Sequence, residues 1–281
     1  MLKKHIKPIF IALLFVVNLS YAEDKQISIT IDDLPFVGSG ASLKEIQSGT
    51  DRFNQILQAL INEQVPATGF VIAGAIAKGQ WQLLENFQKQ GFTIGNHTYS
   101  HANLKEIGAE KYIKEIAKAD KRLLPLMSEK KYFRYPYLEE GRGGNRLAVH
   151  TYLAENQYIV APVTIDSKDF LFNMKLLSVN WKHRAKHLEK IKHQYLSYIW
   201  KQTELAEKIS RGKPTKQILL LHANLLNSHV MADVIQLYKD HGYRFISLDE
   251  ALSPTQSEPK QIEAKASFLP GIFESTSVWT A

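Results

Sequence analysis

Four residues of this sequence have the types and spacing of a catalytic metal site. Asp32 and Asp33 end an alternating apolar run of the kind that forms a strand, and His97 and His101 follow another apolar run with an H-x-x-x-H spacing. Two histidines and one carboxylate leave an open position on a divalent ion such as Zn²⁺. A cation there would lower the pKa of a water molecule. We therefore expect one aspartate to bind the cation and the other to take the water's proton.

Further ionisable residues follow later apolar runs. They are Arg134 and Tyr137 in RYPY, Asp166 and Asp169 in DSKD, and His222 in LLLH. Each alone has an ordinary explanation, such as a surface ion pair, a turn residue, a helix cap or a hydrogen-bonded core histidine. Their joint appearance at successive strand ends predicts a single active site, because the reactive residues of α/β barrels lie at the carboxyl ends of the strands.

The elements that must position these residues alternate along the chain. Strands are predicted at the apolar runs 27–33, 68–74, 92–97, 131–136, 158–166, 217–223 and 243–250. Helices are predicted from apolar periodicity at 51–64, 81–91, 110–127, 143–155, 182–210 and 230–242. Alternation of this kind implies a parallel sheet, and seven strands are enough to close or nearly close a barrel. The predicted fold is a single α/β domain with a distorted (β/α)7 TIM-like barrel.

The ends of the chain differ from this domain. Residues 1–22 have a basic start, a short apolar core and small residues before a cut after Ala22, which predicts a signal peptide. The apolar run is too short for a transmembrane helix, so we expect no stable membrane insertion after cleavage. The catalytic domain is expected at 23–252 and a tail without clear periodicity at 253–281. The expected location is secreted or periplasmic, in a bacterial cell envelope.

Composition excludes some functions. Loss of residues 1–22 removes three lysines, so the formal charge falls from +7 to 35 − 3 − 28 = +4, which makes no case for nucleic acid binding. The chain has no cysteine and therefore neither disulfides nor thiolate ligands. The oligomeric state is left open.

The order of the motifs resembles the polysaccharide deacetylase family, carbohydrate esterase family 4, also called the NodB homology domain. The resemblance covers about residues 26–252. TIDD is similar to the first motif of the family, which implies Asp32 as general base and Asp33 as metal ligand. HTYSH resembles the second motif and implies His97 and His101 as metal ligands. The family fold is a distorted barrel of about seven strands, in agreement with the strand count above.

Three later motifs carry the rest of the resemblance. FRYPY is similar to the third motif, which implies that Arg134 orients the base and that the backbone N–H of Tyr137 holds the oxyanion. DSKDF resembles the fourth and implies that Asp166 supports the acid histidine, while Asp169 either assists at the cleft or caps the next segment. LLLH resembles the fifth and implies His222 as general acid.

The sequence departs from the family pattern at four places. Leu34-Pro35 stands where glycine usually continues the first motif, Tyr135 replaces a second proline, Leu138 replaces a glycine and Phe170 replaces a tryptophan. None of these removes a proposed ligand, acid or base. All four are expected to alter the walls of the cleft and hence the choice of substrate.

The resemblance implies a secreted, metal-dependent hydrolase that removes N-acetyl groups from amino-sugar polymers such as peptidoglycan or a chitin-like glycan. It therefore also implies an acetylated polysaccharide or oligosaccharide as the partner. Zn²⁺ is the expected metal, with Co²⁺ or Ni²⁺ as alternatives. The motifs do not separate amide from ester cleavage, so an acetyl ester hydrolase acting on xylan or another glycan is a second hypothesis. The third is a wall-binding homologue without catalysis.

Overall fold

The computed structural model describes residues 25–36, 42–210 and 216–254. The predicted signal peptide and nearly all of the predicted tail lie outside these residues. Within the described part, no helix combines the length and apolar character needed to cross a membrane.

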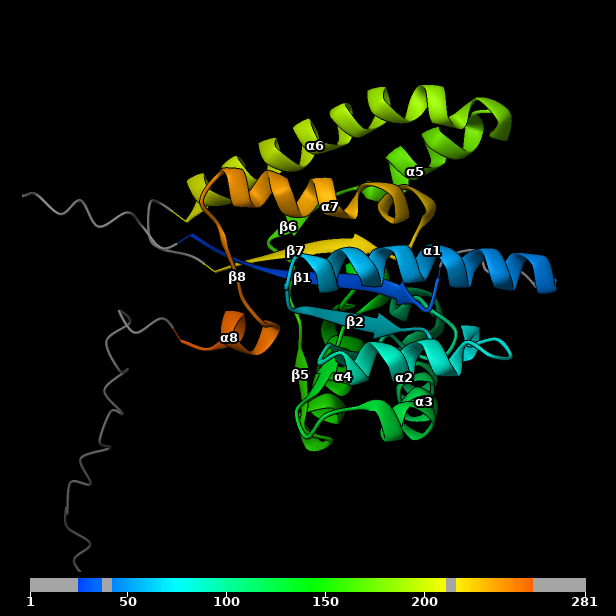
Figure 1. Ribbon diagram of the computed structural model, residues 1–281. Coiled ribbons are helices and arrows are strands. Elements are labelled where there is room, and N and C mark those ends of the chain that lie inside the picture. The colour runs from blue at the N-terminus through cyan, green and yellow to red at the C-terminus, as the bar shows by residue number, and fades with distance from the viewer. Residues whose placement is uncertain (1–24, 37–41, 211–215, 255–281) are drawn as a thin grey trace, which may run out of the picture.

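The described chain folds around one parallel sheet (Figure 1). Its strands are β1 (Gln26–Leu34), β2 (Ala67–Val71), β3 (Thr93–Asn96), β4 (Lys131–Phe133), β5 (Tyr158–Val160), β6 (Ile165–Asp166), β7 (Lys216–His222) and β8 (Arg244–Phe245). Seven strands have the order β5-β4-β3-β2-β1-β7-β6, and β8 pairs with the start of β1. The central strand β1 is buried from Ile27 to Asp32, as expected for a strand in the middle of a parallel sheet that helices cover.

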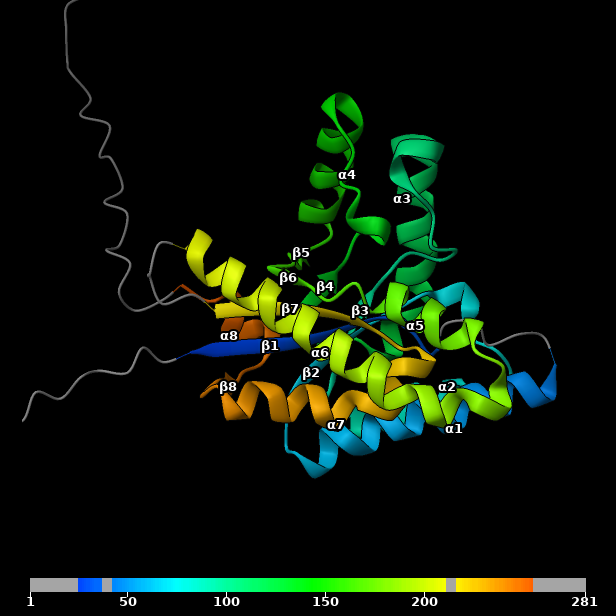
Figure 2. The same ribbon diagram turned by 90° about the horizontal axis from the view of Figure 1, so that it is seen from above.

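Helices cover the sheet. They are α1 (Leu43–Asn62), α2 (Trp81–Lys89), α3 (Leu104–Leu123), α4 (Gly143–Glu155), α5 (Asp169–Ser178), α6 (Arg184–Ile209), α7 (Leu225–Asp240) and α8 (Leu248–Leu252). Helices α5, α6 and α7 lie at one end of the sheet, and α3 and α4 lie at the other (Figures 1 and 2). The main core lies between β1, β2, β7 and the helices α1 and α7, with Ile29, Phe53 and Val234 fully buried.

The predicted strand 158–166 is wrong as a single element, because it contains two strands on opposite edges of the sheet. Ala161 N–H donates to Phe133 O of β4 at 2.8 Å, and Thr164 N–H donates to Ile218 O of β7 at 3.1 Å. Pro162 between them has no N–H to donate to a strand ladder. Four residues therefore connect the two edges, which shows that the sheet curls. The predicted distorted (β/α)7 barrel in a single domain is confirmed.

Other boundaries differ for local reasons. Helix α1 begins at Leu43, not at 51, because Ser42 and Glu45 form a capping box. The predicted strand 243–250 shrinks to β8 and is followed by α8, which Ser247 caps. Helix α5 was not predicted, since its sequence is apolar on most sides.

Candidate active site

The two aspartates of the first motif reach the same cavity from the end of β1. In a regular strand, neighbouring side chains point to opposite faces. Here the register between β1 and β2 shifts between Ile31 and Leu34, and Asp33 has a left-handed φ of 64°. This irregularity allows both carboxylates to line the cavity.

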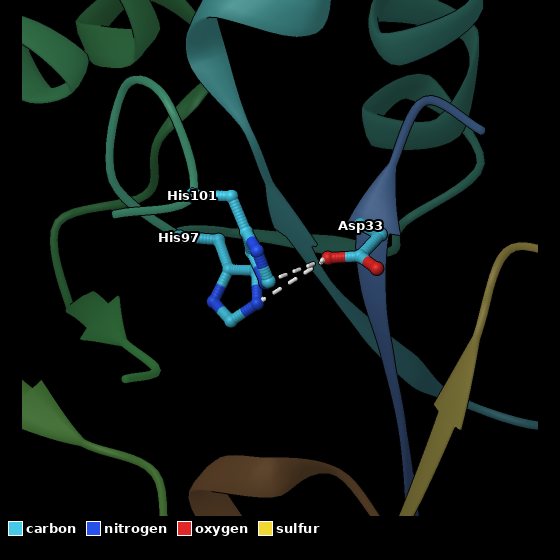
Figure 3. A group of neighbouring side chains, drawn as sticks. All are labelled: Asp33, His97 and His101. Atoms are coloured by element: carbon cyan, nitrogen blue, oxygen red, sulfur yellow. Dashed lines mark ion pairs between the residues drawn. The ribbon is translucent and has the colours of Figure 1, made fainter. Parts of the chain in front are cut away.

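Asp33, His97 and His101 converge on one point (Figure 3). Asp33 Oδ1 lies 3.3 Å from His101 Nε2 and 3.5 Å from His97 Nε2, and the three ligand atoms lie within 4.8 Å of one another. His97 Nδ1 faces the Arg134 carbonyl at 2.8 Å, so Nδ1 carries the proton and Nε2 keeps its lone pair. Burial holds the pKa of His97 well below its ordinary value, which keeps the ring neutral.

This donor set fits a divalent cation. Asp33 Oδ1 is buried and has no hydrogen-bond partner in the described structure, although two imidazole nitrogens face it. An unpaired buried carboxylate oxygen is costly unless a cation or a proton compensates it. One carboxylate oxygen and two imidazole nitrogens are suitable ligands for Zn²⁺ and similar ions.

Side-chain hydrogen bonds hold the backbone of the loop that carries the two histidines. Asn96 Oδ1 accepts the N–H of Thr98 at 2.8 Å, and Glu115 Oε2 accepts the N–H of Ser100 at 2.6 Å. Thr98 and His101 have φ values of 66° and 60°, in the left-handed region. Strained backbone of this kind persists only where surrounding contacts hold it, and it is common at functional sites.

Asp32 lies beside this trio and is paired with Arg134. Its side chain is 3% exposed, and its Oδ2 lies 3.5 Å from Arg134 Nη1. Arg134 is itself held by bonds from Nε to Ala161 O at 2.8 Å and from Nη2 to Thr30 Oγ1 at 3.1 Å. Burial raises the pKa of Asp32 to about 6, although the Arg134 charge opposes the rise. The carboxylate is thus ionised at neutral pH and can accept a proton.

The partner of His222 is Asp169, so the prediction of Asp166 is wrong. His222 Nδ1 and Asp169 Oδ1 are 2.7 Å apart. Asp166 instead pairs with Lys168 Nζ at 2.7 Å and accepts the Lys168 N–H at 3.0 Å. Burial lowers the pKa of His222, but the charge and hydrogen bond of Asp169 outweigh it and raise the pKa to about 10. His222 Nε2 can therefore supply a proton.

Sequence reasoning missed two residues that hold Asp169. Asp169 Oδ2 accepts hydrogen bonds from Asn224 Nδ2 at 2.9 Å, from Asn227 Nδ2 at 2.5 Å and from the His222 N–H at 2.7 Å. Asn224 also caps α7 by accepting the Asn227 N–H at 3.0 Å. An asparagine before a helix is a recognisable cap in the sequence, but its contact with Asp169 is long-range.

A cavity of about 400 Å³ has Tyr137, Leu138 and Phe170 in its walls. Its lining also includes the proposed base, acid and metal ligands: Asp32, His222, Asp33, His97 and His101. Tyr137 has a φ of 58°, and its exposed ring lies 4.5 Å from the His101 ring. Leu138 and Phe170 thus alter the cavity as expected. The other two departures do not line it, because Tyr135 and Leu34-Pro35 are buried in the protein core.

Known proteins are similar to this chain in sequence and in fold. Residues 20–150 match the family model described as polysaccharide deacetylase. A mutant, with restored activity, of a carbohydrate esterase family 4 pseudoenzyme from Bacillus anthracis has a similar fold. Its TM-score is 0.58 at 19% identity, over 82% of this chain and 68% of that one. The resemblance read from the motifs is confirmed to this extent: residues 20–150 match a polysaccharide deacetylase domain, and the described chain shares the fold of carbohydrate esterase family 4 structures.

Two curated relatives match this chain over only part of their own length. The uncharacterised protein YlxY of Bacillus subtilis is 24% identical over 241 residues, which is 85% of this chain and 64% of YlxY. A peptidoglycan N-acetylglucosamine deacetylase of Bacillus cereus is 35% identical over 86 residues, which is 30% of this chain and 31% of that protein. The chain thus spans less than two thirds of either relative.

Proposed function

We propose that this chain is an exported, metal-dependent deacetylase that hydrolyses N-acetyl groups of an amino-sugar polymer such as peptidoglycan. One observation carries the proposal. Asp32 and His222 are register partners on the adjacent parallel strands β1 and β7, and both line the cavity that contains Asp33, His97 and His101. A base and an acid thus share the cavity with a cation site. The B. cereus relative, named for peptidoglycan N-acetylglucosamine, supports the choice of amide and polymer.

The chain's own groups account for the proton transfers. A divalent cation held by Asp33, His97 and His101, with Zn²⁺ as the first candidate, would supply Lewis acidity to the acetyl carbonyl and to water. Asp32 takes one proton from the attacking water, whose oxygen bonds to the carbonyl carbon. His222 gives a proton to the sugar nitrogen as the C–N bond breaks. Acetate and a free amine leave.

Two further groups support these steps. Arg134 keeps Asp32 ionised and fixes its position through the 3.5 Å ion pair. Tyr137 lines the cavity, and its backbone N–H is the proposed donor to the oxygen that becomes negative. Each such donor or acid–base group typically contributes about 10²-fold or more to the rate.

The test is acetate release from N-acetylated chito-oligosaccharides, peptidoglycan and acetylated xylan, with chelator and after addition of Zn²⁺, Co²⁺ or Ni²⁺. We expect release from the amino-sugar polymers that the chelator abolishes and metal restores, and a loss of about 10²-fold or more in Asp32→Asn. Release from xylan alone would support the esterase. A protein that binds no metal and releases no acetate would be the non-catalytic homologue, which has a precedent in the B. anthracis pseudoenzyme.

A further inference from the structure

Helix α5 presents apolar side chains to solvent as well as to the core. Phe170, Leu171, Met174 and Leu177 are 42–56% exposed, and Trp181 in the turn after the helix (Trp181–His183) is 71% exposed. We call these five residues the α5 face. Residues 170, 174 and 177 recur at helical spacing, so they form one stripe. A contiguous exposed apolar surface of this kind usually marks an interaction site.

The segment that follows the α5 face is strongly basic. Residues 170–193 contain six lysines or arginines and one acidic residue, Glu189. The cations are Lys175, Lys182, Arg184, Lys186, Lys190 and Lys192. Of these six cations, only Lys192 forms ion pairs within the described part of the chain. Its Nζ lies 3.0 Å from carboxylate oxygens of Glu189 and of Asp233. The other five cations of this segment, which adjoins the α5 face in the sequence, have no carboxylate partner among the described residues.

A second hollow at the edge of the α5 face adds to this charge. It has a volume of about 630 Å³, and its lining includes Trp181, Arg184, His229 and Arg52 of α1. The one acidic residue in the lining, Asp51, already accepts a hydrogen bond from Gln47 at 2.8 Å. The guanidinium of Arg184 donates to the carbonyls of Val179 and Leu177 and keeps its charge.

We propose that the α5 face and this basic segment dock on an anionic lipid bilayer. Exposed Phe, Leu, Met and Trp side chains next to unpaired lysines have the chemistry of a surface that lies in a membrane interface, with the apolar groups below the headgroups and the cations among them. A protein partner could use the apolar stripe, but the surrounding positive charge favours a negatively charged lipid surface. The docking is peripheral and does not cross the bilayer.

Phe170 connects the docking surface to the catalytic cavity. Phe170 belongs to the α5 face and also lines the catalytic cavity, together with Lys168. Docking through α5 therefore brings the mouth of the cavity to the bilayer surface. The enzyme would meet polymer close to the membrane, although binding to lipid does not itself depend on the proposed deacetylation and is measured without substrate.

The test is flotation of the full chain with vesicles of phosphatidylcholine alone or mixed with phosphatidylglycerol. We expect binding to the anionic vesicles only, weakened by salt. Lys182→Gln/Lys186→Gln should reduce the partition coefficient by about 25-fold, from roughly fivefold per cation. Leu171→Ser/Met174→Ser should reduce it by about tenfold or more. All changed side chains are exposed, so circular dichroism should show an unaltered fold.

Matched controls carry the same substitutions elsewhere. Leu147→Ser/Ile209→Ser removes two apolar side chains that are 69% and 73% exposed on α4 and at the end of α6. Lys105→Gln/Lys111→Gln removes two charges from exposed positions of α3, away from α5 (Figures 1 and 2). We expect both controls to bind like the parent protein. Equal losses in controls and α5 variants would overturn the proposal. A full chain that binds no anionic vesicle would also overturn the proposal.

Discussion

Asp169→Asn should move the alkaline limit of activity to lower pH, and the contacts of Asp169 give the reason. Asp169 is completely buried and is bonded to His222 Nδ1 at 2.7 Å. Its charge keeps the imidazole protonated against the effect of burial, with a pKa of about 10. Asparagine has nearly the same shape but no charge. The substitution therefore removes the main cause of the raised pKa.

The magnitude follows from the protonated fraction of His222. An acid is available below its pKa and is lost above it, so the native histidine is protonated at pH 7.5. Without the charge and hydrogen bond of Asp169, burial pulls the pKa of His222 down toward the ordinary 6.5, against the smaller effects of Asp33 and Asp32. At a pKa of 6.5 about a tenth of the rings carry the proton at pH 7.5. Turnover should fall about tenfold from this cause, and up to about 10⁴-fold if the ring also loses its orientation.

The assay is the pH profile of kcat/KM for acetate release between pH 5 and 10.5. The native acid limb reflects Asp32, whose base form is lost below its pKa of about 6, and the alkaline limb reflects His222. A bound cation lowers both limbs, but it acts equally on the native protein and the variant. Asp169→Asn should shift the alkaline limb by at least about two pH units, while Asp166→Asn, which loses only the Lys168 pair, should leave it in place.

Equal alkaline shifts in the two variants, or a shift in Asp166→Asn alone, would refute the role of Asp169. A thermal melt shows whether lost activity is caused by unfolding of Asp169→Asn. The control is needed because the new amide replaces a carboxylate that accepts several buried hydrogen bonds. We expect destabilisation of roughly 1–3 kcal/mol. That range leaves most proteins folded at assay temperature.

Two further predictions concern the neighbouring groups. Asp33→Asn should lower bound metal to well below one equivalent, since it removes the anionic ligand between the two histidines. Elemental analysis after dialysis measures the bound metal, and full metal content would contradict the site. Arg134→Met should lower the free energy of unfolding by about 3–5 kcal/mol at pH 8, because Asp32 would keep a buried charge without its partner. The loss should shrink near pH 5, where Asp32 binds a proton, and an equal loss at both values would contradict this cause.

The sequence was sufficient for features that depend on local pattern. Apolar runs located β1, β3 and β7, and the residues that follow such runs in a parallel sheet must lie at one edge. For this reason Asp33, His97 and His101 could be placed together before their distances were known. The seven-strand barrel followed from alternation alone, although one predicted strand is in fact two.

Features set by packing could not be read in this way. Asp166 and Asp169 stand in the same short motif, and either could have faced His222. Lys168 takes a left-handed φ of 50°, and α5 begins directly after it, which turns Asp169 inward to the asparagines of α7. The direction of that turn depends on long-range hydrogen bonds, so the spacing of the motif does not contain it.

Helix α5, which the pattern did not predict, connects the chemistry to the outer surface of the protein. Its first residue, Asp169, is hydrogen-bonded to His222, the proposed acid, and its second, Phe170, lines the cavity and begins the exposed α5 face. The buried residues of α5 are Asp169, Asn173 and Leu176, whereas its exposed side is apolar, so the helix lacks the usual amphipathic pattern and was missed. The exposed apolar side chains of α5 can leave water only by packing against an apolar surface outside this domain. An anionic bilayer would supply that surface at the mouth of the active site.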